Sequence, residues 1–206
     1  MQLDTHLVRI STGAQVRAVP TEFVLRLQDR DPQAWEELFN HWFPKLYAYA
    51  LHSTGDAAAA QDLASETFAR AFRDIHRFGQ RGTAVGTWLY TIAHHRVVDF
   101  QRQRARTKVV GLDAAENLAA MSDEQPDPSP AEDGSGRLLH AVQELPPDQR
   151  AVVLLRFYGR LTGQETADIL GKSHGAVRQL QFRALRNLRT ILAALPDQNG
   201  RKGASR

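Results

Sequence analysis

Residues 161–189, LTGQETADILGKSHGAVRQLQFRALRNLR, determine how the rest of this chain is interpreted. Thr162 and Glu165 have the spacing of a capping box, in which each side chain accepts a hydrogen bond from the other residue's backbone N–H. Gly171 stands where a first helix has to end, because glycine adopts the positive φ that closes a helix. Ser173 supplies an N-cap for a second helix. The pattern predicts two helices separated by a tight turn.

The second of these helices has one apolar stripe, since Val177, Leu180, Ala184 and Leu188 recur at spacings of three and four. Its remaining faces carry basic, amide and aromatic side chains: His174, Arg178, Gln179, Gln181, Phe182, Arg183 and Arg186. A short helix, a glycine turn and a longer basic helix are typical of a DNA-binding helix-turn-helix. An ordinary helical hairpin with solvated arginines explains the same residues.

Composition excludes several classes of protein. The chain has 206 residues, of which 42% are hydrophobic, enough for one large or two small domains. No apolar run is long enough to cross a membrane, and the charged N-terminus is no secretion signal, so we expect a cytoplasmic protein without membrane insertion. The absence of cysteine excludes disulfides, cysteine-ligated zinc and thiol redox sensing.

Charge is unevenly distributed, although the net charge is only +3. Residues 109–136 contain no Lys or Arg and are rich in Asp, Glu, Pro and Ser, whereas basic residues outnumber acidic ones between 137 and 195. A polyanion is therefore a suitable partner for the basic segments. Residues 109–136 are too polar to bury a core and are expected to form a flexible acidic linker.

The fold class expected is all-α, with two small helical domains joined by that linker. The domains span residues 20–108 and 137–195. A flexible arm, residues 1–19, precedes them, and a flexible tail, residues 196–206, follows them.

The first domain shows two successive helix starts. Asp31 is expected to cap a helix that begins at Pro32, and Gly55 and Asp56 to separate it from the next one. The apolar residues of the first helix should form the core: Trp35, Leu38, Phe39, Trp42, Leu46 and Tyr49. The next helix should pack through Ala59, Leu63, Phe68, Ala71, Phe72 and Ile75, with Asp62, Glu66, Arg70 and Arg73 outside.

Asp62 and Glu66 are like charges at i,i+4, a slightly unfavourable pair that suggests a basic partner, although a solvated face explains it too. Residues 76–87 contain three glycines and are expected to form a loop, with Thr87 capping the next helix. That helix has an apolar side formed by Trp88, Leu89, Ile92, Val97 and Phe100, and its second half is basic. An aromatic and basic surface suits single-stranded nucleic acid, although basic residues also satisfy the helix dipole.

Four segments in this order resemble the extracytoplasmic-function (group 4) sigma factors of bacterial RNA polymerase. They are QDLASETFARAF (61–72), GTWLYTIAHHRVVDF (86–100), LPPDQRAVVLLRFYGRLTGQETADILG (145–171) and SHGAVRQLQFRALRNL (173–188). The resemblance covers about residues 20–195. It implies a non-catalytic subunit that binds core polymerase, recognises −35 and −10 promoter elements and melts the −10 region.

The resemblance also implies partners and sites. The partners are core polymerase, through its β′ clamp helices and β flap, promoter DNA and an anti-sigma protein, with no cofactor or metal. The holoenzyme would place the protein on the nucleoid. The polymerase-binding residues implied are Asp62, Glu66 and Arg70. Those implied for the −10 element are Arg77, Arg81, Trp88, His95, Arg96 and Asp99. Those implied for the −35 element are Ser173, His174, Arg178, Gln179, Phe182 and Arg183.

The sequence departs from the family at two positions of the last helix. Many relatives have a basic residue where this chain has Leu180 and an apolar one where it has Gln181. The residues that contact bases therefore depend on how Leu180 orients this helix.

Two other functions remain open at this point. One is a helix-turn-helix regulator that does not engage polymerase. The other is a metal or acid–base enzyme that would use Asp62, Glu66, His94, His95 and Asp99. No His-x-x-x-His or Glu-x-x-His spacing, as a metal site would need, occurs around these residues.

Overall fold

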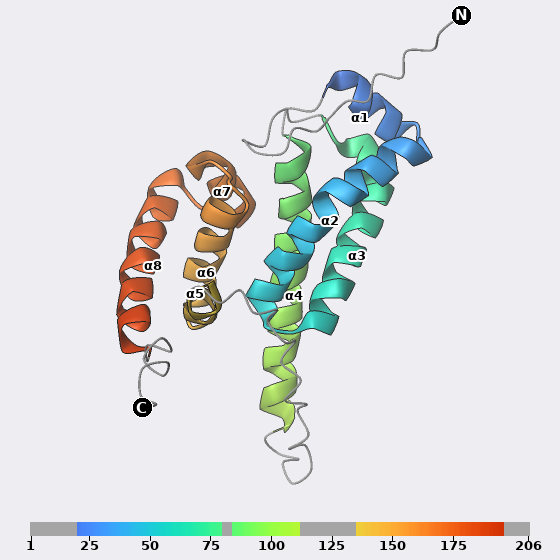
Figure 1. Ribbon diagram of the computed structural model, residues 1–206. Coiled ribbons are helices and arrows are strands. Elements are labelled where there is room, and N and C mark those ends of the chain that lie inside the picture. Colours follow the sequence, from blue (N-terminus) through green and yellow to red (C-terminus); the bar gives the residue numbers. More distant parts are fainter. Residues whose placement is uncertain (1–19, 80–83, 112–134, 196–206) are drawn as a thin grey trace, which may run out of the picture.

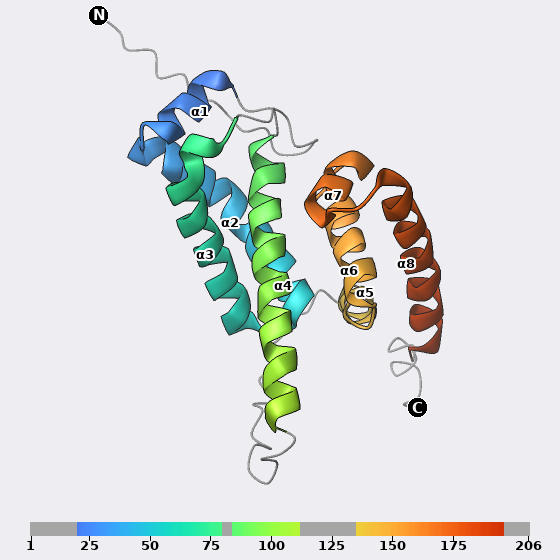
Figure 2. The ribbon, with the colours of Figure 1, turned by 180° about the vertical axis from the view of Figure 1, so that it is seen from behind.

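The computed structural model describes residues 20–79, 84–111 and 135–195, and every regular element in these ranges is a helix. Two groups of helices lie side by side, α1–α4 and α5–α8 (Figures 1 and 2). The expected all-α fold with two small helical domains is thus confirmed. The arm, most of the acidic linker and the tail lie outside the described residues, as does Arg81. No helix of the described ranges is long and apolar enough to cross a membrane.

The first group contains four α-helices and one short 3-10 turn: α1 (Thr21–Gln28), α2 (Pro32–Thr54), α3 (Ala57–Asp74), η1 (Ile75–Arg77) and α4 (Val85–Gly111). The second group contains α-helices and a π-helical turn: α5 (Ser135–Gln143), α6 (Pro147–Val153), η2 (Leu154–Tyr158), α7 (Gly163–Leu170) and α8 (His174–Ala194).

Local sequence explains the ends of α2 and α3. The Asp31 side chain accepts a hydrogen bond from the Gln33 N–H at 2.9 Å, and Pro32 is the first residue of α2. Gly55 ends that helix with a φ of 72°, and Asp56 caps α3 by accepting from the Ala59 N–H at 3.0 Å. These predictions are confirmed.

The predicted cap at Thr87 is wrong. Helix α4 already begins at Val85, which is buried, and Thr87 lies within its first turn with 2% of its surface exposed. This earlier first turn of α4 is packed against α2. Gly86 lies against the Trp42 ring so closely that a Cβ there would come within 2.1 Å of it. The Thr87 hydroxyl donates instead to Glu165 in α7.

The core between α2, α3 and α4 contains most of the expected residues, including Leu38, Trp42 and Tyr49. Phe39 and Phe72 are corrections, since 41% and 37% of their surfaces are exposed. Both stand at the edge of the apolar arc of their helices and lie against the rings of other aromatic residues. The ring centroids of Phe39 and Phe68 are 4.9 Å apart, and those of Phe72 and Trp35 are also 4.9 Å apart.

The second group forms the predicted helix-turn-helix. The capping box is present, with Thr162 Oγ1 accepting from the Glu165 N–H at 3.2 Å and Glu165 Oε2 accepting from the Thr162 N–H at 2.7 Å. Gly171 ends α7 with a φ of 60°, and Ser173 caps α8 by accepting from the Ala176 N–H at 3.2 Å. On α8, Val177, Ala184 and Leu188 are buried, whereas Leu180 is half-buried.

Candidate promoter and polymerase interfaces

The outward face of α8 carries five of the six residues expected at a −35 element. His174, Arg178, Gln179, Phe182 and Arg183 are all exposed. Phe182 stands out because 71% of its surface is in solvent, which is costly for an aromatic ring without a partner. Arginine can bind guanine bidentately, glutamine can do so with adenine, and an apolar ring can contact a thymine methyl group. This face therefore has the chemistry of a major-groove surface.

Ser173, the sixth expected residue, already has an intramolecular role as the cap of α8. Immediately beside it, the His174 ring lies over Gly163, where a Cβ would come within 2.6 Å of Nε2. Gly163 thus lets the starts of α7 and α8 approach each other. The exposed N-terminus of α8 carries the positive end of its helix dipole, which favours a phosphate group.

Contacts with the rest of this half determine the rotation of α8. Leu180 packs against Val152, Ala167 and Val177, so this side chain faces inward. The neighbouring Gln181 is held by Arg156, whose Nε donates to the Gln181 Oε1 at 3.2 Å. Leu180 and Gln181, the two positions where this sequence departs from the family pattern, therefore both make contacts within the second half. The residues left for DNA are those on the opposite side of the helix.

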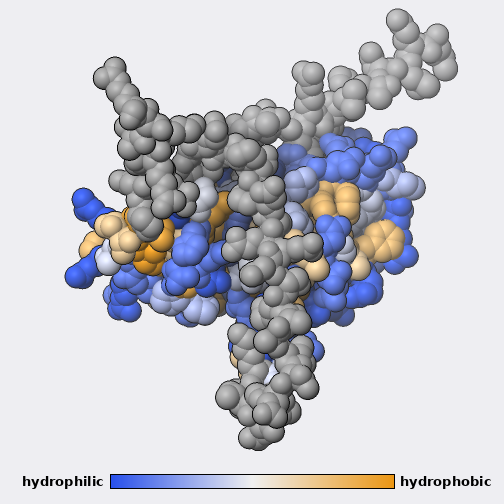
Figure 3. All heavy atoms as spheres, turned by 60° about the horizontal axis from the view of Figure 1, so that its bottom comes forward, coloured by the Kyte–Doolittle hydropathy of each residue, from blue (hydrophilic) through white to orange (hydrophobic). Residues whose placement is uncertain are grey.

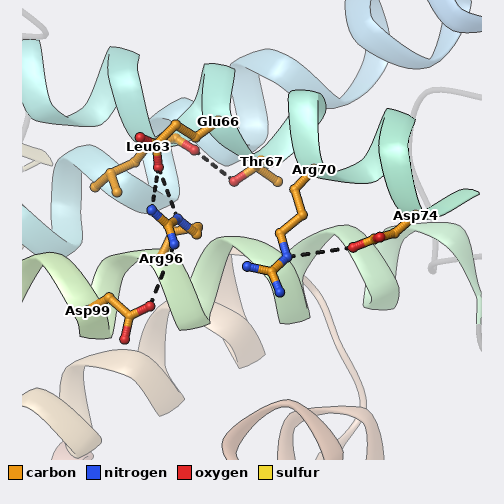
Figure 4. A network of polar contacts seen from close by, with 7 residues as sticks. All are labelled: Leu63, Glu66, Thr67, Arg70, Asp74, Arg96 and Asp99. Carbon is orange, nitrogen blue, oxygen red and sulfur yellow. Dashed lines mark hydrogen bonds and ion pairs between the residues drawn. The ribbon is translucent and has the colours of Figure 1, made fainter.

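A network of charged side chains joins α3 to α4 (Figure 4). Arg96 of α4 donates from Nε and Nη2 to the Glu66 Oε2, at 2.9 and 2.7 Å. Arg96 also lies 3.6 Å from the Asp99 carboxylate, and Arg70 lies 3.6 Å from Asp74 within α3. The structure thus brings together Glu66, expected to bind polymerase, and Arg96 and Asp99, expected near the −10 element.

The structure brings only some of the other residues expected at the −10 element to an exposed surface. Arg77 and His95 are exposed, at the end of η1 and on the outer side of α4. Trp88 is half-buried, with its ring 5.0 Å from that of Phe78, so only part of this indole is free to stack on a base. Asp62 of the polymerase set is exposed on α3.

His94 and His95 have different surroundings despite their adjacency. His94 faces inward, where its Nδ1 is 2.9 Å from the Tyr49 hydroxyl in a hydrogen bond. Burial, together with the neighbouring His95, lowers the pKa of His94 to about 4. His94 is therefore neutral near pH 7. In the described ranges no cluster of three or more His, Asp or Glu side chains could hold a metal ion.

Sequence reasoning missed Arg150 and Arg156, which organise the second half. The Arg150 guanidinium donates to the carbonyls of Gln143 and Leu145 and, at 2.8 Å, to that of Ser53 in α2. Arg156 donates to the Leu161 carbonyl as well as to Gln181. The available signal was that each arginine lies beside or inside an apolar run, where a charged side chain needs acceptors.

Comparisons with known proteins agree with these features. The Sigma-70 region 2 family model matches residues 38–107, and the Sigma-70, region 4 model matches residues 141–190. The chain is 39% identical to the ECF RNA polymerase sigma factor BldN of Streptomyces coelicolor, over 85% of this chain and 66% of that relative. It is 31% identical to the ECF RNA polymerase sigma factor RpoE of Cereibacter sphaeroides, over 78% of this chain and 87% of that relative.

Two solved structures share the fold. The sigma factor RpoE of Bartonella quintana, in complex with the anti-sigma factor NepR, has a TM-score of 0.61 at 21% identity. That likeness covers 78% of this chain and 98% of the other. CnrH in complex with the cytosolic domain of CnrY has a TM-score of 0.62 at 18% identity, covering 85% of this chain and 97% of the other.

Proposed function

Because the chain belongs to the extracytoplasmic-function sigma factors of the sigma-70 family, we propose that it binds core RNA polymerase and directs transcription initiation at its own promoters. In this role it recognises −35 and −10 elements and melts the −10 region. It acts by binding alone, without catalysis, cofactor or metal. The observation that carries the proposal is the outward face of α8, where arginine, glutamine and an exposed phenylalanine lie together in the N-terminal half of the helix.

At the −35 element, α8 enters the major groove by its N-terminal part, as recognition helices do. His174, Arg178 and Gln179 then lie nearest the base edges, and Phe182 and Arg183 follow one turn later. At the −10 element, the segment from Arg77 to Trp88 and the outer side of α4 receive the unpaired strand. Unpairing and unstacking a base costs a few kcal/mol, which contacts with that base and its backbone have to offset.

The polymerase-binding surface proposed is the outer side of α3, with Asp62, Glu66 and Arg70. Basic side chains of the partner would compensate the like charges of Asp62 and Glu66. The β′ clamp helices are the proposed partner of this surface, and the β flap is the proposed partner of the second half.

Within the holoenzyme the protein resides in the cytoplasm, on the nucleoid. An anti-sigma protein is a further proposed partner, since the solved structures above include such complexes.

We also propose the domain limits of the sequence analysis, residues 20–108 and 137–195, as functional limits. Helix α4 continues to Gly111 and α5 begins at Ser135, so helices extend slightly into the acidic linker on both sides. A regulator that uses only its helix-turn-helix is not favoured, because α2–α4 match sigma region 2.

The test is reconstitution of core polymerase with this chain on promoters identified by mapping transcription starts after overexpression. The folded protein should form open complexes on them. Arg178→Ala should relax base preference at one or two −35 positions, at about 1–3 kcal/mol per contact. Arg189→Ala, an exposed arginine farther along α8, is the matched control and should weaken all sequences alike. Failure of the folded protein to open any promoter would exclude the proposed function.

A further inference from the structure

Arg156 connects the two helices of the helix-turn-helix through one guanidinium group. It lies in η2, a π-helical turn closed by the Gly159 N–H, which donates to the Leu154 carbonyl at 2.8 Å. From this half-buried position its Nη1 donates to the carbonyl of Leu161, the residue immediately before the cap of α7. Its Nε donates to the Gln181 Oε1 of α8 at 3.2 Å. The start of α7 and the middle of α8 are thus tied to the same side chain.

Apolar packing alone defines the rotation of α8 less sharply than this bond does. The buried stripe of α8 consists of Val177, Ala184 and Leu188, and its middle residue is only an alanine. In Figure 3, where the second half lies on the left as it does in Figure 1, hydrophilic residues surround the few apolar ones. Hydrophobic attraction is non-directional, whereas a hydrogen bond requires a defined distance and angle. The bond between Arg156 and Gln181 therefore restricts rotation of α8 in a way that the stripe cannot.

A small rotation of α8 is enough to change which bases its outer residues can bind. Side-chain tips lie about 5–6 Å from the axis of a helix, so a rotation of about 10° moves them by about 1 Å. Hydrogen bonds form between about 2.7 and 3.2 Å, so that shift breaks a bidentate contact of arginine with guanine. Such a contact discriminates against the wrong base by roughly 5- to 150-fold. Arg178 lies three residues before Gln181, on the adjoining face of α8, and moves with it.

We propose that Arg156, acting through Gln181, is a positioning residue that sets the base preference of this protein at the −35 element. Arg156 has this role without contacting a base, because it fixes the angle at which Arg178 enters the major groove. Many relatives have an apolar residue in place of Gln181, and an apolar side chain cannot accept this hydrogen bond. The rotation of α8, and with it the preferred sequence, therefore differs from that of such relatives. The inference rests on the proposed function.

The test measures base preference and not affinity. Holoenzyme reconstituted with each variant selects promoters from a library randomised at the −35 element, and the opened promoters are sequenced. Gln181→Leu removes the acceptor at similar volume. It should change the preference by at least about fivefold at the base pairs that Arg178→Ala identifies. Gln181→Glu keeps an acceptor for Arg156 and should retain the wild-type preference.

Changing the donor tests whether Gln181 acts through Arg156. Arg156→Met should produce the same new preference as Gln181→Leu, and the double variant should match either single variant, because both remove one bond. A change in Gln181→Leu that Arg156→Met does not reproduce would overturn the proposal, because Gln181 would then contact a base itself. If Arg156→Met does not fold, the contrast between Gln181→Leu and Gln181→Glu decides the question.

A second side-chain hydrogen bond of α8 supplies the matched control. The Asn187 Nδ2 donates to the Gln149 Oε1 of α6 at 2.8 Å, more than two turns after Arg178. Asn187→Leu should lower stability, as Gln181→Leu does, but leave the base preference unchanged, and circular dichroism verifies that each variant is folded. The same change of preference in Asn187→Leu would refute a specific role of Arg156.

The wild-type protein separates this inference from the function on which it rests. If the wild-type holoenzyme opens no promoter of the library, the proposed function and the positioning role both fail. If it selects a −35 sequence that folded Gln181→Leu selects equally, only the positioning role of Arg156 fails.

Discussion

Exchanging the charges of Glu66 and Arg96 separates the structural role of this ion pair from its proposed role in binding. The pair is exposed, with 54% of the Glu66 side chain and 31% of the Arg96 side chain in solvent. Exposed pairs contribute about 0.2–1 kcal/mol. Glu66→Arg loses that contribution and places two cations together, a repulsion of about 1 kcal/mol at 4 Å in water. We therefore expect the free energy of unfolding to fall by about 1–2 kcal/mol.

The double variant Glu66→Arg with Arg96→Glu should recover most of this loss, because an opposite-charge pair is restored. A deficit of about 0.2–0.5 kcal/mol should remain, since the new carboxylate at position 96 stands three residues before Asp99. All differences should shrink in about 1 M salt, where the Debye length is only about 3 Å. Urea unfolding followed by tryptophan fluorescence measures this half, because all three tryptophans lie in it.

Function should not recover with stability. In the double variant both side chains have the wrong sign for their proposed partners, the polymerase clamp at position 66 and DNA at position 96. Core-polymerase binding and open-complex formation should stay impaired in the stable double variant. If binding and promoter opening return together with stability, the pair is a purely structural contact and both site assignments are wrong. A loss above about 3 kcal/mol for the single variant would instead show that this pair is not screened as an exposed pair should be.

Three further predictions concern stability. The pKa of His94 in the folded protein, about 4, lies below the ordinary 6.5. The stability it contributes is therefore complete above pH 6.5 and lost as the pH falls toward 4, by about 2 kcal/mol between pH 8 and pH 5. Urea titrations at both pH values should show this, and His94→Gln should reduce the dependence without abolishing it, because the pKa values of His41 and His52 are also lowered by burial. Thr162→Ala should lower the free energy of unfolding by about 1 kcal/mol, because it removes the cap of α7. Circular dichroism measures this loss, because this half has no tryptophan. An unchanged unfolding midpoint would contradict the role of the capping box. Leu180→Lys should cost about 1–3 kcal/mol, since a charge would replace an apolar contact, and thermal unfolding would show it. A fully stable variant would mean that position 180 faces outward and is open to DNA.

Features set by neighbouring residues could be predicted from the sequence. The capping box, the glycine at the end of α7, the serine cap of α8 and the Asp31–Pro32 start of α2 each depend on groups within a few residues of one another. Their hydrogen bonds form with local geometry alone, so spacing is enough to identify them. The outward face of α8 followed in the same way from the period of its apolar residues.

Features set by packing could not be predicted in this way. Periodicity placed Phe39 and Phe72 in the core, but how far the apolar arc of a helix is covered depends on where its neighbours cross it. The start of α4 moved from Thr87 to Val85 because Trp42, more than forty residues away, packs on Gly86. The pairing of Glu66 with Arg96 likewise depends on how α3 and α4 align.

By itself, the sequence determined that this chain is helical, that an acidic segment divides it into two halves, and that the second half is a helix-turn-helix with an outward basic face. Those properties follow from short-range hydrogen bonding and from the period of burial along single helices. Only the tertiary structure decided that Leu180 faces inward, that Arg96 is paired with Glu66, and that α7 docks on α4 through Thr87 and Glu165. The physical reason is that these contacts join residues 30 to 78 positions apart or depend on how helices cross, and no local pattern encodes which surfaces then meet.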